Sequence, residues 1–400
     1  IRWFGNRYTL RVPGQRPFTR HEVRFARAIG AVLSARYRAI LSPQLLVERG
    51  DLFRGAIEDR YVGAFFDLEP YDFSRGSVPA DRVALAIEMM RVAALSTYEN
   101  QPISTGVLLL GADEDPVGRY PAVERDAVHY TGALTSIKSF YRLADGRRTV
   151  FVVNRAGRLL DIVDVARWAD EAQPDADVEV PCAQTYMAHA RATAAGGHVC
   201  VVLNPRREIK VFAEGSQVFS FSHADWRLLD QTSKYAMWQT AVGNPALAER
   251  LFRTALDLSD ARQGALFVVL RRPIDSLAQL VAATDRLDME FVHHPAGPAV
   301  PSRRDLLHLL AGRTITELDP NVLAALATLD GATVADVGGT LLAVGAILRH
   351  PLTSEQAKSD GLAEGARTTA ALAASRFGPV LKVSEDGLIT CYDGGRIWDL

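Results

Sequence analysis

The chain has 400 residues, of which 48% are hydrophobic, so it is long enough for two or three domains with sizeable cores. Its formal net charge of -2 excludes a protein that holds nucleic acid or an anionic membrane surface by bulk charge. Any polyanion that it binds must therefore be small and locally held.

The first section, residues 1–120, is expected to form an α/β region. Thr19 and Glu22 have the spacing of a capping box, and apolar residues at helical spacing follow them, which predicts a helix over 20–38. A second helix is predicted over 79–95. The run Thr-Gly-Val-Leu-Leu-Leu at 105–110 is typical of a fully buried strand.

The second section, residues 121–244, is expected to be rich in strands. Turn-forming residues separate pairs of apolar runs and predict two hairpins. Ser222 is placed to cap a helix over 224–242, which would end at Gly243. The predicted strands are 150–154 and 159–163, then 199–203 and 209–212, and finally 218–221.

The third section, residues 245–400, is expected to be a mixed α/β domain, so the fold class predicted for the whole chain is α/β. A predicted helix followed by a glycine-containing strand occurs twice, with the strand at 106–110 and again at 264–270. We call this repeat the echo, and it suggests the hypothesis of a duplicated core. The predicted helices are 245–258, 275–284, 302–310, 319–326 and 367–375, and the predicted strands are 265–270, 332–335, 341–346, 380–384 and 389–392.

The cysteines and the hydropathy pattern indicate where the protein works. Cys182, Cys200 and Cys391 are widely separated, so neither a disulfide framework nor a zinc site is indicated. No apolar run reaches the roughly 18 residues of a membrane span, and the first residues lack the pattern of a signal peptide. We therefore expect a cytoplasmic protein with no membrane partner.

Three short segments of the third section carry residue types that suit phosphate chemistry. They are Leu-Asp-Gly-Ala at 329–332, Glu-Gly-Ala-Arg-Thr-Thr-Ala-Ala at 364–371 and Lys-Val-Ser-Glu-Asp-Gly-Leu-Ile at 382–389. A carboxylate can hold a divalent metal or accept a proton, and an arginine can bind phosphate bidentately. A helix start can aim free N–H groups at an anion.

In this order the three segments resemble the diadenylate cyclase (DAC) domain, and the resemblance covers about 245–400. That family carries an Asp-Gly-Ala motif that opens a strand, a Gly-Thr-Arg-His-Arg motif that starts a helix, and a Val-Ser strand end. The resemblance implies a homo-oligomer that condenses two ATP molecules into cyclic di-AMP with Mg or Mn. It gives Asp330 a catalytic and metal-binding role. The residues that it assigns to nucleotide binding are Gly331, Ala332, Gly365, Arg367, Thr368, Thr369 and Ser384.

The helix-start motif departs from the family pattern at three positions. Ala366, Thr368 and Thr369 stand where the family has Thr, His and Arg, so a hydroxyl, an imidazole and a guanidinium are missing. Charge-assisted hydrogen bonds are worth roughly 1.5 to 3 kcal/mol each, so triphosphate binding should weaken unless other cations substitute. The nearby candidates in the sequence are Arg349, His350, Arg376 and Lys382.

Three functions stay open at this point: a divergent cyclase, a sensor that binds ATP or a cyclic dinucleotide without turnover, and a structural oligomerisation module. Asp-Gly alone usually marks a turn, and a strand-end serine such as Ser384 often satisfies backbone groups. The three-part pattern favours a functional interpretation of Asp330. The phrases at 96–99 and 145–146 are similar to the N-terminal regions of the sensor type called DACNV.

Overall fold

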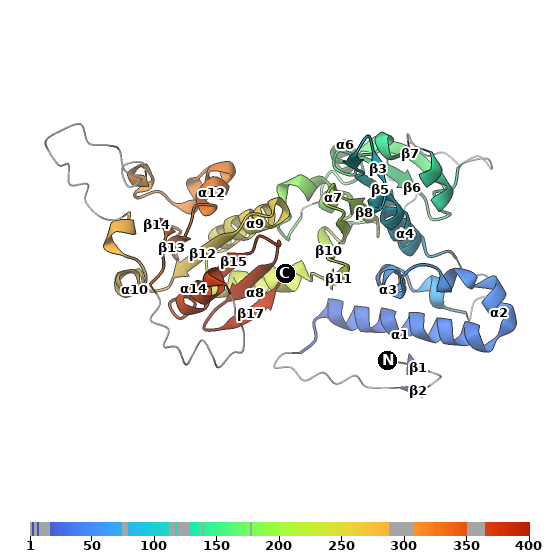
Figure 1. Ribbon diagram of the computed structural model, residues 1–400, viewed down its shortest axis with the longest axis horizontal. Coiled ribbons are helices and arrows are strands. Elements are labelled where there is room, and N and C mark those ends of the chain that lie inside the picture. The colour runs from blue at the N-terminus through green and yellow to red at the C-terminus, as the bar shows by residue number, and fades with distance from the viewer. Residues whose placement is uncertain are drawn as a thin grey trace. The chain divides into compact units, whose positions relative to one another are not determined.

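The computed structural model describes residues 2–3, 6–7, 17–73, 79–111, 117–118, 120, 128–137, 140–176, 178–287, 307–349 and 365–400 (Figure 1). The chain divides into two compact units, each with its own mixed sheet, which confirms the α/β class. Unit 1 comprises Ile1–Val180 and Thr185–Gln231, and unit 2 comprises Pro181–Gln184 and Thr232–Leu400. Within the described ranges, no helix is long and apolar enough to cross a membrane.

The helices of unit 1 begin where side chains cap them. The predicted capping box is confirmed at the start of α1 (Arg20–Leu41), where the Glu22 N–H donates to Thr19 Oγ1 and the Thr19 N–H donates to Glu22 Oε2. The second predicted helix, α4 (Arg82–Ala94), begins at Asp81, whose carboxylate accepts the Ala84 N–H. The other helices are α2 (Pro43–Glu48), α3 (Ile57–Phe66), α5 (Phe140–Leu143), α6 (Val165–Ala172) and α7 (Met187–Ala192).

The large sheet of unit 1 has the order β11-β10-β9-β8-β5-β6-β7. Only the β5–β6 pair is parallel, and every other neighbouring pair is antiparallel. Because β5 lies between β8 and β6, strands that the sequence assigned to two different sections share one sheet. The bounds are β5 (Thr105–Leu109), β6 (Thr149–Val153), β7 (Leu159–Asp164), β8 (Val199–Leu203), β9 (Ile209–Ala213), β10 (Ser216–Ser222) and β11 (Asp225–Leu228), with two short hairpins, β1 (Arg2–Trp3) with β2 (Asn6–Arg7) and β3 (Thr97–Tyr98) with β4 (Gln101–Pro102).

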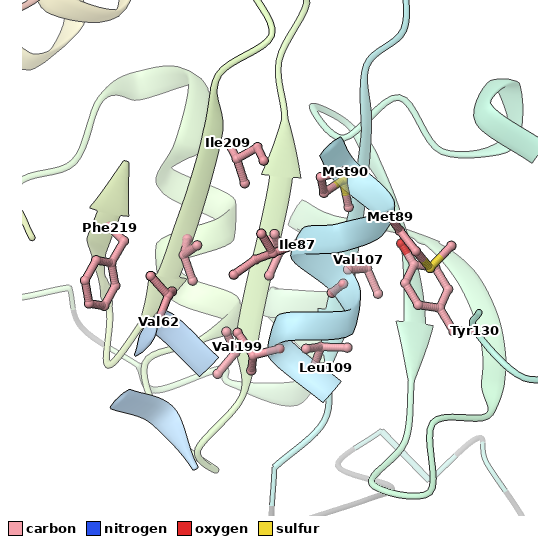
Figure 2. Close-up of a cluster of buried hydrophobic side chains, with 14 of the residues drawn as sticks. Val62, Ile87, Met89, Met90, Val107, Leu109, Tyr130, Val199, Ile209 and Phe219 are labelled. Atoms are coloured by element: carbon pink, nitrogen blue, oxygen red, sulfur yellow. The ribbon is translucent and has the colours of Figure 1, made fainter. Parts of the chain in front are cut away.

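The core of unit 1 lies between α4 and the centre of this sheet. Figure 2 shows Ile87 and Met90 of α4 beside Val107 and Leu109 of β5, and all four side chains are fully buried. Successive residues of a strand face opposite sides of a sheet, so the alternate positions of β5 supply this contact. Burial of each such side chain stabilises the fold by roughly 1.5 to 3 kcal/mol.

The helix predicted over 224–242 is wrong in its first third. His223 and Ala224 both have positive φ, 54° and 68°, and form a two-residue hairpin turn between β10 and β11. Ser222 therefore ends a strand instead of capping a helix. Trp226 of β11 packs on Phe221, with 5.3 Å between ring centroids, and this cross-strand contact favours the hairpin. The helix α8 starts only at Gln231 (Gln231–Val242).

The sheet of unit 2 has the order β14-β13-β12-β15-β16-β17, with β12 and β13 parallel. The predicted strands are confirmed, whereas β17 was missed, and most of the predicted helix 302–310 lies outside the described residues. The helix α14 lies over the face that carries Leu266 and Val268. The bounds are α9 (Pro245–Ala261), α10 (Pro273–Leu280), α12 (Pro320–Ala327), α14 (Ala366–Ala374), β12 (Ala265–Leu270), β13 (Ala332–Asp336), β14 (Leu341–Ala346), β15 (Val380–Val383), β16 (Ile389–Tyr392) and β17 (Arg396–Asp399).

The two sheets repeat one topology, as the hypothesis of a duplicated core predicts. The order β10-β9-β8-β5-β6-β7 matches β17-β16-β15-β12-β13-β14, with the same parallel pair in each. The turns that follow β8 and β15 align the two sheets, because the backbone hydrogen bonds of Asn204 match those of Ser384. With the turns aligned, Val201 and its partner Val107 correspond to Leu381 and its partner Phe267. The glycines of the echo do not correspond: this register sets Ser104 against Gly264.

Candidate functional site

The three motif segments of unit 2 meet at one edge of its sheet. The strands β12 and β13 begin at this edge and β15 ends there, because β12 is parallel to β13 and antiparallel to β15. Phe267 pairs with Thr333, and continuing that register by three residues brings Gly264 beside Asp330. Ala265 pairs with Val383, so the next residues in that register are Gly264 and Ser384. We call this the site edge.

Asp330 is exposed at the site edge, between the end of α12 and the start of β13. In the part of the chain that the structure describes, no three His, Cys, Asp or Glu side chains gather as a metal site. Mg²⁺ is usually held by one or two carboxylates together with the phosphates of a substrate. A single exposed carboxylate at this position therefore fits a metal that arrives with a nucleotide.

Gly331 and Ala332 have structural roles inside unit 2. Gly331 has φ 116°, and a Cβ at this position would overlap the backbone of Gly345 and Ala346 at the end of β14. Its missing side chain thus serves close packing of two strands. Ala332 is completely buried in the core of the sheet, so its side chain cannot line a ligand site.

Arg367 lies in the first turn of α14, against the start of β12. A Cβ on Gly264 would overlap its guanidinium, so the absence of a side chain there makes room for the arginine. Arg367 Nη1 lies 3.7 Å from Glu385 Oε1, and the two side chains are 37% and 77% exposed. An ion pair this exposed contributes little to stability, so the guanidinium can exchange its partner for a phosphate at small cost.

The other residues of the helix start differ in exposure. Gly365 is the exposed N-cap of α14 and no side chain caps the helix there. Thr368 is buried and its Oγ1 accepts a hydrogen bond of 2.9 Å from Lys382 Nζ. Thr369 is half-buried, and its N–H donates to Gly365 O at 3.3 Å. Glu364 lies outside the described residues.

Ser384 closes the turn between β15 and β16. Its N–H donates to Leu388 O, and its carbonyl accepts the Gly387 N–H, each at 2.9 Å. The residue is half-buried at the site edge, one position beyond β15. Its backbone role is therefore established by geometry, and a ligand role for its hydroxyl stays a prediction.

The substitute cations proposed from the sequence are separated by the fold. Arg349 is exposed beyond the end of β14, at the site edge. Arg376 lies past the far end of α14, about 13 Å along the helix axis from Arg367, so it cannot reach the same phosphate. Lys382 is buried beneath α14, and His350 lies outside the described residues.

Two contributors to the site edge were missed in the sequence. Gly264 was noted only as part of a strand, although it adjoins the Arg367 guanidinium. Arg262 ends α9 with φ 59°, and its guanidinium lies where a Cβ on Gly387 would be. The sequence does contain a signal for both residues: Arg262 follows a predicted helix, and Gly264 directly precedes a predicted strand.

Comparisons with known proteins add little to this geometry. No protein-family model matches the chain, and no curated protein matches it. A hypothetical membrane spanning protein from Bacillus cereus aligns with 19% identity and a TM-score of 0.30, over 42% of this chain and 72% of that chain. A double mutant of DacA from Staphylococcus aureus aligns with 20% identity and a TM-score of 0.24, over 38% and 85% of the two chains. Neither likeness carries an argument about function.

Proposed function

We propose that unit 2 binds the phosphate groups of ATP or a cyclic dinucleotide at the site edge, as a divergent DAC-like domain. The observation that carries the proposal is the meeting of Asp330, Arg367 and Ser384 around the start of β12, with Gly264 leaving room for the arginine. These residues come from three separate segments. Their convergence supports a common ligand, because a carboxylate, a guanidinium and a free helix start suit a metal-bound phosphate.

Mg or Mn fits this proposal as a partner of the nucleotide. Asp330 would hold the ion together with the phosphate oxygens, and the ion would neutralise charge that develops on the α-phosphate and the leaving pyrophosphate. Arg367 would orient the phosphate through its two parallel N–H donors. The N–H groups of the first turn of α14, which no side chain caps, would complete the contact from the helix start.

Turnover to cyclic di-AMP requires a second molecule. Each 3′-hydroxyl must reach the α-phosphate of the other ATP, so two site edges would face each other across a two-fold axis in a homo-oligomer. A sensor that binds without turnover is the second candidate. It is favoured by Thr368, whose buried hydroxyl is engaged by Lys382, where the family presents an imidazole.

Calorimetric titration of the chain with ATP and Mn²⁺ tests binding. Arg367→Met should weaken ATP at least about tenfold, because it removes charge-assisted hydrogen bonds worth roughly 1.5 to 3 kcal/mol. Arg376→Met is the matched control, since it removes the same charge at the other end of α14 and should leave affinity unchanged. Equal affinities of the two variants would refute the proposal.

A second assay separates the two candidates. The chain is incubated with ATP and Mn²⁺, products are identified by mass, and the oligomeric state is followed by light scattering. A cyclase should give cyclic di-AMP that is lost in Asp330→Asn, whereas Asp275→Asn, an exposed change in α10, should keep the product. Binding without product, or a chain that stays strictly monomeric under turnover conditions, rules out the cyclase and leaves the sensor.

A further inference from the structure

Unit 1 has an edge that corresponds to the site edge of unit 2. The strands β5 and β6 begin there and β8 ends there, in the same order and register as β12, β13 and β15. The turns that follow β8 and β15 are also alike. Asn204 and Arg207 make the same backbone hydrogen bonds in one turn that Ser384 and Gly387 make in the other.

Arginines occupy this edge of unit 1. Arg147 and Arg148 precede β6, and Arg206 and Arg207 lie in the turn after β8; all four are exposed. We call these four residues the basic edge. The register sets Arg148 against Asp330 and Arg206 against Asp386, so charge is reversed at equivalent positions. The basic edge is therefore built differently from the site edge.

Both turns hold the backbone of their arginines in place through side-chain hydrogen bonds. Asp145 Oδ1 accepts the backbone N–H groups of Arg147, Arg148 and Thr149 at 2.7 to 3.0 Å. Asn204 Oδ1 accepts the N–H groups of Arg206 and Glu208, each at 3.0 Å. The two turns, whose backbones are held in place, thus carry four arginines at the ends of the two strands that flank β5.

The carboxylates nearby are engaged in other contacts. Asp145 binds the backbone of its own turn, Asp164 caps α6 through two N–H groups, and Glu208 accepts the Asn204 Nδ2 hydrogen at 2.7 Å. Among the residues that the structure describes, Arg147, Arg148 and Arg207 form no ion pair. Their charge is available to a ligand.

Strand spacing fixes the size of that ligand. Neighbouring strands lie about 4.8 Å apart, so β6 and β8, on the two sides of β5, are separated by about 10 Å. Extended arginine side chains from both turns can meet over this gap. Guanidinium groups bind phosphate bidentately, so we infer that the basic edge is a second anion site, which takes a small ligand with two or more linked phosphate groups.

Inorganic pyrophosphate is the probe, titrated into the full chain carrying Arg367→Met so that the site edge does not contribute. Pyrophosphate should bind, more weakly at high salt, and Arg148→Gln with Arg207→Gln should weaken it about tenfold or more. The matched control, Arg54→Gln with Arg227→Gln, removes two exposed arginines elsewhere in unit 1 and should change affinity less than about twofold.

Each outcome decides the inference. Absence of pyrophosphate binding overturns the inference. Equal losses of pyrophosphate affinity in the two double variants would overturn it too, because binding would then depend only on net charge. Tighter binding of ATP than of pyrophosphate, lost with the same two arginines, would identify a nucleotide as the source of the phosphates. Because Arg367 is already absent in these titrations, failure here leaves the proposal for unit 2 untouched.

Discussion

Unit 1 and unit 2 share a strand order but differ in the chemistry at the equivalent edge. Around the start of β12, Asp330 and Asp386 accompany Arg367, whereas Arg148 and Arg206 stand at the matching positions around β5. The sheets are alike because the central strands of both are continuous apolar runs that are buried on both faces. The edges differ because they consist of exposed turns, where substitutions cost little stability.

The units also differ in how buried polar groups join their elements. In unit 1, Asp59 of α3 accepts two hydrogen bonds from Arg91 of α4, at 2.6 and 2.7 Å, and a third of 2.8 Å from Trp226 of β11. A buried carboxylate thus connects two helices to the β10–β11 hairpin. In unit 2, a buried polar contact of another kind, the 2.9 Å hydrogen bond from Lys382 Nζ to Thr368 Oγ1, joins β15 to α14.

The largest expected effect follows from this difference. Asp59→Ala should lower the free energy of unfolding of unit 1 by about 3 kcal/mol, because it leaves Arg91 and the Trp226 N–H without their acceptor. The transition of unit 2 should be unchanged. Denaturant unfolding followed by hydrogen exchange in each unit makes the measurement, and an equal loss in both units would show that they do not unfold separately.

Two glycines of unit 2 should respond differently to the same substitution. Gly331→Ala should destabilise unit 2 by roughly 2 kcal/mol, because φ 116° is strained for alanine and the new Cβ meets the backbone of β14. The atoms nearest to a Cβ in Gly264→Ala belong to the movable end of Arg367, so this variant should reduce ATP affinity with little loss of stability. Melting curves measure the stability of both variants, and titrations measure their ATP affinity. A Gly264→Ala variant that keeps full ATP affinity would contradict the proposal that Arg367 binds phosphate beside Gly264.

A pH dependence of stability between pH 6.5 and 9 should appear in unit 1. The hydrogen bond to Asp230, followed by the contact with Glu214, raises the pKa of His21 from 6.5 to about 9. A raised pKa in the folded state gives stability that is complete below pH 6.5 and is lost as the pH rises through 9. Because Glu214 is half exposed, we expect a loss of about 1.5 kcal/mol.

Unfolding measured at pH 6 and pH 9.5 checks this effect. His21→Gln should flatten the pH profile of unit 1, since glutamine cannot take up the proton. His129→Gln is the control, because it changes another histidine of the same unit that has no carboxylate contact in the described chain. If the His21→Gln variant keeps the wild-type profile, another group must cause it.

The smallest expected effect concerns the altered helix start. Thr369→Arg should tighten ATP binding roughly fivefold, or about 1 kcal/mol, because this half-buried position of the first turn can present a guanidinium to phosphate. Thr368→His should not add to it, since Thr368 is buried against Lys382. Titration of each single variant measures the gain, and weaker binding by Thr369→Arg would show that the phosphate lies elsewhere.

Much of the fold could be predicted because its signals are local. The capping box at Thr19 and the apolar run at 265–270 each contain enough information to place one element. The hairpin turn at His223 and Ala224 carries no such signal, because it lacks the glycine or asparagine that usually marks a two-residue turn, and β11 was therefore predicted as helix. The glycine echo was misaligned by two residues because the alignment of the two sheets depends on the turns that follow β8 and β15, which the short strand pattern does not contain.

The sequence could predict which motifs belong to the candidate site, but not which side chains contact one another there. Asp330 and Arg367 stand out by sequence pattern, and the fold brings their segments to one edge. The contact of Lys382 with Thr368 and the room that Gly264 leaves for Arg367 depend on how α14 packs on the sheet. Helix geometry alone, at 1.5 Å per residue, would have removed Arg376 from the candidates.

Hydrogen exchange of the full chain, with and without ATP and Mn²⁺, is the most direct test of the central claim that the three segments form one nucleotide site. The account predicts slower exchange on ligand addition in 263–266, 329–333, 365–370 and 384–388 together, whatever occurs at the basic edge of unit 1. Unchanged exchange in these four segments, under conditions where ATP binds, would contradict it.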